Sequence, residues 1–320
     1  MSYMIKISQD DNDRRLDRIL RGLFKHITLG EIMKSIRKGE VRVNSKRVKE
    51  PGTKIFAGDE LVVKWPPENE NNEKENEKKI FAHNSWGKIK ILFQGENVLI
   101  LNKPAGILVQ PDEPGGDSVI SRVWAMTGSK TPAAVHRLDR NTTGVLAVAL
   151  HGEALRALEE LFKNRSVRKF YLAVVTGQAP EEIIIDAPLL KDSENNLVKV
   201  SDEGLTAVTK CERIATDGKF SLVKLELLTG RTHQARVHMA HIKHPILGDR
   251  KYGDFRINRL MKKITRPLLH AYELEFPDNL RPALSEIEGK TFSAPLPDDM
   301  KEFLNELGIR SEELGVRHES

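Results

Sequence analysis

A polar segment near residue 70 divides this chain into a small and a large part. Residues 68–79 contain only Glu, Asn and Lys and follow Pro66 and Pro67, so they offer no apolar side chain to a core. The sequence therefore predicts a small domain over 1–65, a polar linker over 66–84 and a larger domain over 85–296. Residues 297–320 are rich in acidic side chains and predict a short helix followed by a tail.

The charge is unevenly divided between these parts. The whole chain has a formal net charge of +5, and residues 1–65 alone carry 15 basic and 9 acidic side chains. The rest of the chain is therefore close to neutral. A small basic domain beside a neutral one favours binding of a polyanion such as nucleic acid, although a merely solvated basic face would give the same count.

The composition excludes several classes of protein. Hydrophobic residues make up 39% of the chain and charged residues 30%, as in globular proteins rather than disordered or collagen-like ones. Cys211 is the single cysteine, which excludes an internal disulfide and a multi-cysteine zinc site. We find neither an apolar leader segment nor a run of about 20 apolar residues. We therefore expect a cytoplasmic protein with no membrane partner.

The small domain combines two predicted helices with a basic turn. Apolar residues recur at helical spacing over 16–23 and 32–36, and a strand near 41–43 leads into a tight turn at Asn44 and Ser45. Five basic residues surround this turn, namely Arg37, Lys38, Arg42, Lys46 and Arg47. The pattern resembles the small ribosomal protein S4-type RNA-binding domain, and this resemblance implies that the basic face binds structured RNA.

Most of the larger domain reads as strands. Predicted strands cover 90–93, 98–102, 144–149, 169–176, 207–213, 220–228 and 272–276, and predicted helices cover 153–163 and about 232–242. Many consecutive strands with few helices between them favour an α+β fold with a mixed, largely antiparallel sheet. Neither glycine-rich phosphate-binding motif, G-x-G-x-x-G or G-x-x-x-x-G-K-[ST], occurs, so we expect no nucleotide cofactor.

A charged cluster lies between a proline-containing loop and an apolar strand. Asp139 lies between Arg137 and Arg140. A carboxylate close to guanidinium groups stays ionised, which suits a nucleophile or a charge stabiliser rather than a proton donor. A turn held together by an Arg–Asp salt bridge is the structural alternative for the same segment.

A second cluster opens the helix predicted over 232–242. We expect Thr232 to cap this helix, which places His233 and Arg236 on one helical face. From there Arg236 could reach a carboxylate across the site and hold it through its planar guanidinium group. The alternative is an ordinary surface arginine, since arginines on helices are usually exposed.

The histidines of this cluster raise the possibility of a metal site. His233, His238, His241 and His244 lie within twelve residues. Their spacings of five, three and three residues give no H-x-x-x-H pair, and only His233 and His241 share a face, two turns apart. No H-E-x-x-H motif is present. We therefore expect no metal.

Tyr171 is a third candidate. It lies in a strand-like segment, where its side chain faces away from those of Phe170 and Leu172. It could stack on a base or act as a general base, and an ordinary core tyrosine is the alternative.

Together these segments are similar to the RluA family of pseudouridine synthases. The match comprises, in the family's order, residues 101–106, 136–144, 169–173, 230–238 and 244–253. Five ordered motifs are far more specific than any one of them, and they span nearly the whole chain. The resemblance implies isomerisation of uridine to pseudouridine in RNA, without any cofactor.

The resemblance also implies a role for each candidate residue. Asp139 corresponds to the catalytic aspartate, which attacks the ribose C1′ or assists loss of a C2′ proton. Tyr171 corresponds to the tyrosine that stacks on the base and helps to remove its carbon-5 proton, and Arg236 to the basic residue that pairs with the aspartate. Arg137 corresponds to a residue that enters the RNA stack when the target nucleotide flips out, and Arg140 is expected to contact RNA beside it.

Within the family, the N-terminal domain and residues 249–256 resemble the RluC branch, which modifies several uridines of 23S ribosomal RNA. The RluD branch is the near alternative, because both branches carry the extra domain. We expect large-subunit ribosomal RNA or the assembling large subunit as the partner of a monomeric enzyme. The competing functions are a non-catalytic RNA-binding assembly factor, against which the intact motif around Asp139 argues, and a metal-dependent RNA hydrolase.

Overall fold

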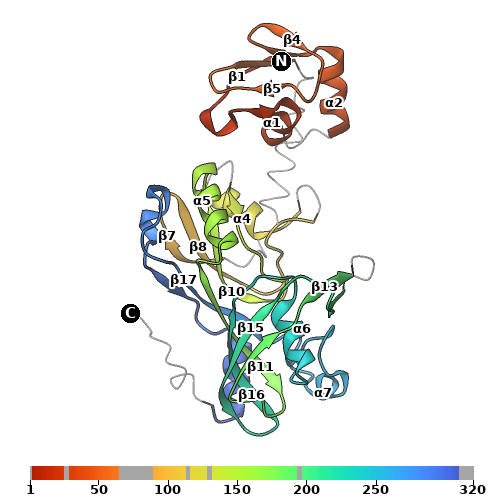
Figure 1. The fold of residues 1–320 in the computed structure, drawn as a ribbon, viewed down its shortest axis with the longest axis vertical. Helices are drawn as coiled ribbons and strands as arrows, with labels where there is room; N and C mark the ends of the chain where they lie inside the picture. The colour runs from red at the N-terminus through yellow and green to blue at the C-terminus, as the bar shows by residue number, and fades with distance from the viewer. Residues whose placement is uncertain are drawn as a thin grey trace. The chain divides into compact units, whose positions relative to one another are not determined.

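The chain forms two compact units, Met1–Lys88 and Ile89–Ser320 (Figure 1). The computed structural model describes residues 2–24, 29–64, 89–112, 116–127, 132–192 and 197–309. The predicted linker, 66–84, and the last part of the predicted tail, 310–320, lie outside these described residues. The domain boundaries at 65 and 85 therefore stay predictions.

The small unit is a four-stranded antiparallel sheet packed against two helices. The sheet order is β1 (Ser2–Lys6), β6 (Glu60–Lys64), β3 (Val41–Val43) and β4 (Lys46–Val48). The helices are α1 (Leu16–Leu23) and α2 (Leu29–Lys38), as predicted, and a short 3₁₀ turn, η1 (Gln9–Asp11), precedes the separate pair β2 (Arg14–Arg15) and β5 (Lys54–Ile55). Fully buried apolar residues from both helices and the sheet, including Leu16, Ile32, Ile36 and Val63, form one core. This unit therefore has a hydrophobic core of its own.

The predicted basic turn is a tight hairpin. Asn44 and Ser45 both have positive φ, 48° and 67°, as a two-residue turn between twisted antiparallel strands requires. The turn places Arg42 directly opposite Arg47 in the strand register. Like charges in this position are destabilising, so the arrangement calls for an anionic partner that offsets the repulsion.

The large unit is built on one long mixed sheet. Its strand order is β12 (Glu182–Asp186), β15 (Val208–Thr216), β16 (Phe220–Leu227), β11 (Arg168–Thr176), β17 (Leu269–Glu275), β10 (Thr143–Ala149), β8 (Val98–Lys103) and β7 (Lys90–Gln94). Two short strands pair with inner strands of this sheet, β9 (Ala133–Ala134) with β10 and β18 (Thr291–Ser293) with β17. The pairs are antiparallel except for β10 with β17, which confirms the predicted mixed, largely antiparallel α+β architecture.

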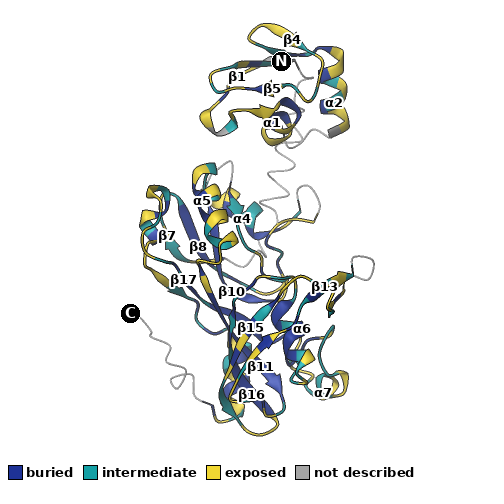
Figure 2. Ribbon diagram, viewed as in Figure 1, coloured by how far each residue is buried: buried dark blue, intermediate teal, exposed yellow. Residues whose placement is uncertain are grey.

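Helices cover both faces of this sheet. Helices α4 (Val119–Thr127) and α6 (Gln234–His241) pack on one face, and α5 (Gly152–Lys163), the 3₁₀ segment η2 (Pro282–Ile287) and α8 (Asp298–Glu306) pack on the other. A two-stranded ribbon, β13 (Leu189–Asp192) with β14 (Leu197–Val200), and the short helix α7 (Phe255–Leu260) complete the described elements. Figure 2 shows the central strands as buried. In the described part of the chain, no helix is long and apolar enough to cross a bilayer.

The middle strands are apolar on both sides because both faces are covered. In β11, Tyr171 and Ala173 pack toward α6, whereas Leu172 and Val174 pack toward α8. This confirms the alternation predicted for Tyr171. It also places the Tyr171 side chain on the face of the sheet that carries α6.

Gly144 allows the parallel pair in the centre of the sheet to form. Its φ is +116°, and a Cβ atom there would lie 2.0 Å from the carbonyl oxygen of Ala271 on β17. Any other residue would push the two strands apart. This close crossing begins β10 directly after the loop that carries Asp139.

Candidate active site

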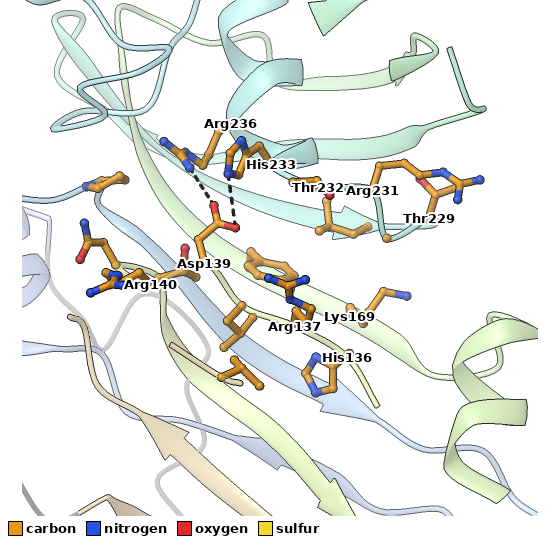
Figure 3. A pocket seen from close by; sticks show the side chains of 18 of the residues that line it. His136, Arg137, Asp139, Arg140, Lys169, Thr229, Arg231, Thr232, His233 and Arg236 are labelled. Carbon is orange, nitrogen blue, oxygen red and sulfur yellow. Dashed lines mark hydrogen bonds and ion pairs between the residues drawn. The ribbon is translucent and has the colours of Figure 1, made fainter. Parts of the chain in front are cut away.

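A cleft of about 1170 Å³ opens on the α6 face of the sheet (Figure 3). Among the described residues its lining includes two acidic side chains, Asp139 and Glu159. The ten basic side chains that line it are Arg137, Arg140, Lys163, Arg165, Lys169, Lys191, Arg231, Arg236, Arg250 and Lys251. An electropositive cleft of this kind suits a phosphate-rich ligand, and it surrounds the Asp139 carboxylate with cations.

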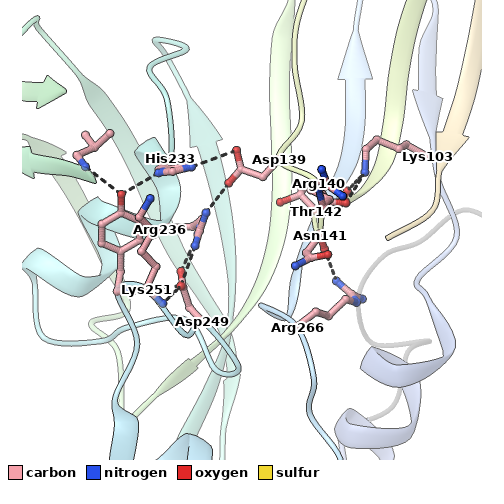
Figure 4. A network of polar contacts seen from close by, with 12 residues as sticks. Lys103, Asp139, Arg140, Asn141, Thr142, His233, Arg236, Asp249, Lys251 and Arg266 are labelled. Carbon is pink, nitrogen blue, oxygen red and sulfur yellow. Dashed lines mark hydrogen bonds and ion pairs between the residues drawn. The ribbon is translucent and has the colours of Figure 1, made fainter. Parts of the chain in front are cut away.

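Asp139 lies in the loop between β9 and β10, and Lys103 holds this loop in place. Lys103 is fully buried, and its Nζ donates hydrogen bonds of 2.9 Å to the carbonyl oxygens of Pro104, Arg140 and Thr142 (Figure 4). On the other side, Arg266 Nη1 donates to the carbonyl oxygen of Asn141 at 3.3 Å. The backbone on the C-terminal side of Asp139 is therefore fixed by buried donors.

The ammonium group of Lys103 has one hydrogen for each of its three acceptors. Burial lowers the pKa of Lys103 to about 7, although the charge of Asp139 opposes that shift. Loss of a proton would leave one loop carbonyl without its donor. The clamp on the Asp139 loop therefore depends on the charge state of Lys103.

Arg236, on the first turn of α6, joins two aspartates. Its Nη1 donates to Asp139 Oδ2 at 2.8 Å, while Nε and Nη2 donate to the two oxygens of Asp249 at 2.7 and 2.8 Å. The Asp249 side chain is 0% exposed and that of Arg236 is 11% exposed. Asp249 thus fixes the guanidinium plane, and the remaining edge holds Asp139 at the cleft surface, where its side chain is 29% exposed. The predicted pairing of Arg236 with a carboxylate across the site is confirmed in geometry.

Electrostatics keep this pair of Arg236 and Asp249 charged. Burial by itself would lower the pKa of Arg236, but the hydrogen bond with Asp249 and the charges of Asp249 and Asp139 raise it above its usual value. Burial would likewise raise the pKa of Asp249, and the hydrogen bond from Arg236 lowers it instead. Each ion is stabilised by the other, as a buried ion pair must be.

Tyr171 lines the cleft from β11 beneath this pair. Its side chain belongs to the hydrophobic cluster of the α6 face, and the residue is 8% exposed. Burial and the nearby charge of Asp139 raise its pKa well above the usual tyrosine range. The phenol is therefore protonated at neutral pH, and it presents a flat apolar surface to the cleft.

The beginning of α6 differs from the prediction. The helix starts at Gln234 rather than after a Thr232 cap, because His233 precedes it in a left-handed conformation with φ 54°. Gln234 is 2% exposed and takes over the anchoring role: its Oε1 accepts from the Arg231 backbone and the Thr229 hydroxyl, and its Nε2 donates to Val208 and Thr209. This buried amide fixes the turn that presents His233 and Arg236 to the cleft.

His136 has a structural environment. His136 Nε2 accepts a hydrogen bond from the Ala147 backbone at 3.0 Å, and its ring stacks on Phe162 at 4.7 Å. Burial lowers the pKa of His136 to about 3, so the ring stays neutral. Throughout the described ranges, no three His, Cys, Asp or Glu side chains gather as a metal site would require.

The predicted RNA-binding residues fall into two groups. Arg137 and Arg140 are exposed residues of the cleft, and Arg140 also contacts Asp112 at 3.4 Å. In the small unit, Arg37, Lys38, Lys46 and Arg47 are exposed and Arg42 is half-buried. They lie on α2 and the β3–β4 hairpin, which matches the predicted basic face in position.

Three further residues belong to the site although sequence reasoning gave them no role. These are Lys103, Asp249 and His233, whose Nε2 lies 3.9 Å from Asp139 Oδ1. Each lies inside a segment of the family resemblance. A buried lysine in an apolar strand was the one signal that could have identified Lys103, since an unpaired buried charge is costly. Asp249 and His233 carry no comparable signal in the sequence.

Comparison with known proteins agrees with this geometry. Residues 97–241 match the RNA pseudouridylate synthase family, and residues 14–61 match the S4 domain. The ribosomal large subunit pseudouridine synthase C of Pasteurella multocida is 37% identical over 95% of this chain and 93% of its own length. The protein of the same name from Escherichia coli K12 is 35% identical over 95% and 96%.

A solved structure shares the fold of the large unit. The human RNA pseudouridylate synthase domain-containing protein 4 superposes with a TM-score of 0.57 and 26% identity, covering 74% of this chain and 98% of that one. The relatives thus match both units and nearly the full length of the chain. On this evidence the chain belongs to the RluA family of pseudouridine synthases, the isomerases that convert uridine in RNA to pseudouridine.

Proposed function

We propose that this enzyme isomerises specific uridines of large-subunit (23S) ribosomal RNA, with Asp139 as its catalytic residue. The observation that carries the proposal is a partly exposed carboxylate, Asp139, in a basic cleft, held by an arginine that a second, buried carboxylate fixes in turn. The relatives from Pasteurella and Escherichia are both named synthase C, which supports the C-type rather than the D-type branch.

The reaction exchanges one bond at the ribose for another. The bond from C1′ to N1 of uracil breaks, and Asp139 promotes this step by attacking C1′ or by accepting a C2′ proton. The uracil anion then turns, a bond forms from C1′ to carbon 5, the carbon-5 proton leaves and N1 gains a proton. On the first route the bond between Asp139 and C1′ breaks as the bond from C1′ to carbon 5 forms, and on the second route Asp139 returns its proton to C2′. Both routes need an ionised carboxylate, and Arg236 Nη1 donates a hydrogen bond to its Oδ2 at 2.8 Å.

Tyr171 and Arg137 are proposed to handle the flipped nucleotide. The uracil would pack on the ring of Tyr171, and the hydroxyl oxygen would receive the carbon-5 proton only as its own proton leaves, because the raised pKa keeps the phenol protonated. The Asp139 carboxylate reaches a sugar of folded RNA only after the nucleotide leaves the stack. Arg137, exposed at the cleft, is suited to fill the vacated position with its flat guanidinium group.

The small unit is proposed to hold the RNA without selecting the uridine. Its basic residues Arg37, Lys38, Arg42, Lys46 and Arg47 surround a hairpin whose like-charge pair calls for an anion. Arg140 would contact the backbone next to the target. We further propose that the enzyme acts as a monomer in the cytoplasm, where its one thiol, Cys211, is buried and reduced.

The proposal is tested by mapping pseudouridines in large-subunit ribosomal RNA through carbodiimide modification and primer extension. RNA comes from cells lacking the protein, complemented with the wild type, Asp139→Ala or Asp112→Asn. Asp112 is the matched control, because it is an exposed aspartate that does not line the cleft. We expect defined sites to disappear in the deletion and to return with the wild type and Asp112→Asn only.

Two outcomes would contradict the proposal. If no site in large-subunit ribosomal RNA depends on the protein, the substrate assignment is wrong. If Asp139→Ala restores every site, Asp139 is not catalytic, and an RNA-binding assembly factor becomes the better description.

A further inference from the structure

His233 occupies a constrained position beside the proposed catalytic residue. It directly precedes α6, has a left-handed backbone with φ 54°, and its side chain is 14% exposed in the cleft (Figure 4). Residues other than glycine rarely adopt this conformation, and such outliers concentrate at functional sites. The imidazole faces Asp139 Oδ1, the oxygen that Arg236 leaves free, with Nε2 at 3.9 Å.

Tyr252 determines which imidazole nitrogen carries the proton. The Tyr252 hydroxyl accepts a hydrogen bond from the Val198 backbone at 3.0 Å and lies 2.8 Å from His233 Nδ1. The hydroxyl hydrogen needs an acceptor, and Nδ1 provides one at this distance. This arrangement favours the neutral tautomer in which Nδ1 accepts from the hydroxyl and the single N–H is on Nε2, the nitrogen that faces Asp139.

We propose that His233 is a positioning residue for Asp139: its neutral imidazole, locked by Tyr252 with the proton on Nε2, steers Oδ1 while Arg236 holds Oδ2. The separation of 3.9 Å is longer than a hydrogen bond, so Oδ1 stays uncommitted in the free enzyme. A small rotation of the carboxylate toward a bound ribose brings Oδ1 within reach of the donor. This inference rests on the proposed role of Asp139.

A neutral donor suits this position better than a second cation. The charged and titratable groups that face His233 are Asp139, Asp249, Arg236, Lys251 and Tyr252. Burial lowers the pKa of His233, the charge of Asp139 opposes that shift, and Arg236 and Lys251 add to it. Protonated His233 would form an ion pair with Oδ1 and so make this oxygen less available to the ribose. His233 therefore guides Asp139 only while the imidazole is neutral.

The first test measures single-turnover rates on a large-subunit ribosomal RNA fragment tritiated at carbon 5 of uridine, from which each isomerisation releases tritium. We compare His233→Ala, His233→Gln and the control His241→Asn, which changes an exposed histidine of the same helix. We expect His233→Ala to lower the rate about 10- to 100-fold with unchanged RNA affinity, as a mispositioned catalytic group does. Glutamine keeps an N–H donor near the Nε2 position and should recover the rate to within about threefold of wild type.

The second test uses pH to separate positioning from packing. Tyr252→Phe keeps the aromatic ring at position 252 but removes the hydroxyl that donates to His233 Nδ1. The neutral form of His233 is therefore less favoured in this variant. We expect the rate deficit of Tyr252→Phe relative to wild type to grow between pH 8 and pH 6. The same change made in the His233→Gln background should produce no such growth, because glutamine does not titrate.

The outcomes separate this inference from the proposed function. If Asp139→Ala releases tritium at the wild-type rate, the proposed function fails. If Asp139→Ala is inactive while His233→Ala matches wild type, only the role of His233 is refuted. Equal losses in His233→Ala and His233→Gln, or a Tyr252→Phe deficit that is constant with pH, would reduce His233 to a packing role.

Discussion

The two basic regions of this chain use arginine in opposite ways. In the small unit, Arg42 and Arg47 face each other across a hairpin, and neither forms an ion pair with another described residue. In the large unit, Arg236 is nearly buried and binds two carboxylates through three nitrogen atoms. An exposed arginine acts through charge at a distance, whereas a buried and fully bonded arginine acts through geometry. Substitutions that keep the charge but change the shape should therefore separate the two regions.

The largest effect is expected from Arg236→Lys. Lysine keeps the positive charge but cannot bind Asp249 through two nitrogens and Asp139 through a third, so Asp139 loses its fixed orientation. We expect the single-turnover rate to fall at least about 100-fold while RNA affinity changes little. Rapid-quench tritium release and filter binding measure the two quantities. A lysine variant that retains more than a tenth of the wild-type rate would show that charge alone suffices here.

The site around Arg236 in the large unit was only partly predictable from the sequence. Asp139, Arg236 and Tyr171 lie in segments whose residue order resembles the family. Strand β10, which follows the Asp139 loop, and strand β11, which carries Tyr171, are continuous apolar runs that a periodicity analysis recovers. Asp249 and Tyr252 sit in a loop. Their partners depend on how that loop folds back onto α6, a long-range contact for which local sequence contains no information.

The sequence did not predict helix α4, nor several elements at the margins of the fold. Strands β12, β13 and β14 and helix α7 are short, and each is shaped by the neighbour on which it packs. The start of α6 was placed at Thr232 because threonine is a common cap. The buried side chain of Gln234 anchors the start of the helix in place of that cap. Glutamine is not a common capping residue, so the sequence does not predict this role.

A buried histidine should make the stability of the large unit sensitive to acid. His270 is fully buried, with Nδ1 bonded to the Thr143 hydroxyl and Nε2 to the Ala294 carbonyl, and burial lowers its pKa to about 4. The same group titrates near 6.5 in an unfolded chain. Between these values the unfolded state binds the additional proton, so stability is complete above about pH 6.5 and falls as the pH drops toward 4.

We expect protonation of His270 to lower the free energy of unfolding by roughly 3 kcal/mol by pH 4, at about 1.4 kcal/mol for each unit by which its pKa differs between the two states. Urea unfolding at pH 7.5, 5.5 and 4.5 measures it. His270→Asn should be less stable than wild type at pH 7.5 but should lose less stability on acidification. His241→Asn is the control and should follow the wild type. Identical pH slopes for all three proteins would exclude His270 as the titrating group.

The charge of the hairpin should matter for affinity rather than chemistry. In Arg42→Gln/Arg47→Gln both opposed charges are lost, and we expect RNA affinity to fall about tenfold near 0.1 M salt. The slope of log affinity against log salt concentration should decrease by about 2, one for each phosphate contact. Saturating single-turnover rates should equal wild type. A reduced rate at saturating RNA would mean that the small unit also orients the target.

Arg47→Lys is the counterpart of Arg236→Lys and should have the smallest effect. Arg47 is exposed on β4 and lies opposite another cation, so its guanidinium shape has no protein partner to satisfy. Lysine keeps the charge that attracts phosphate, and we expect RNA affinity within about twofold of wild type with an unchanged salt slope. Filter binding at several salt concentrations tests this. A loss as large as that of the double glutamine variant would show that Arg47 makes a shape-specific contact with RNA, which would place it with Arg236 rather than with the exposed charges.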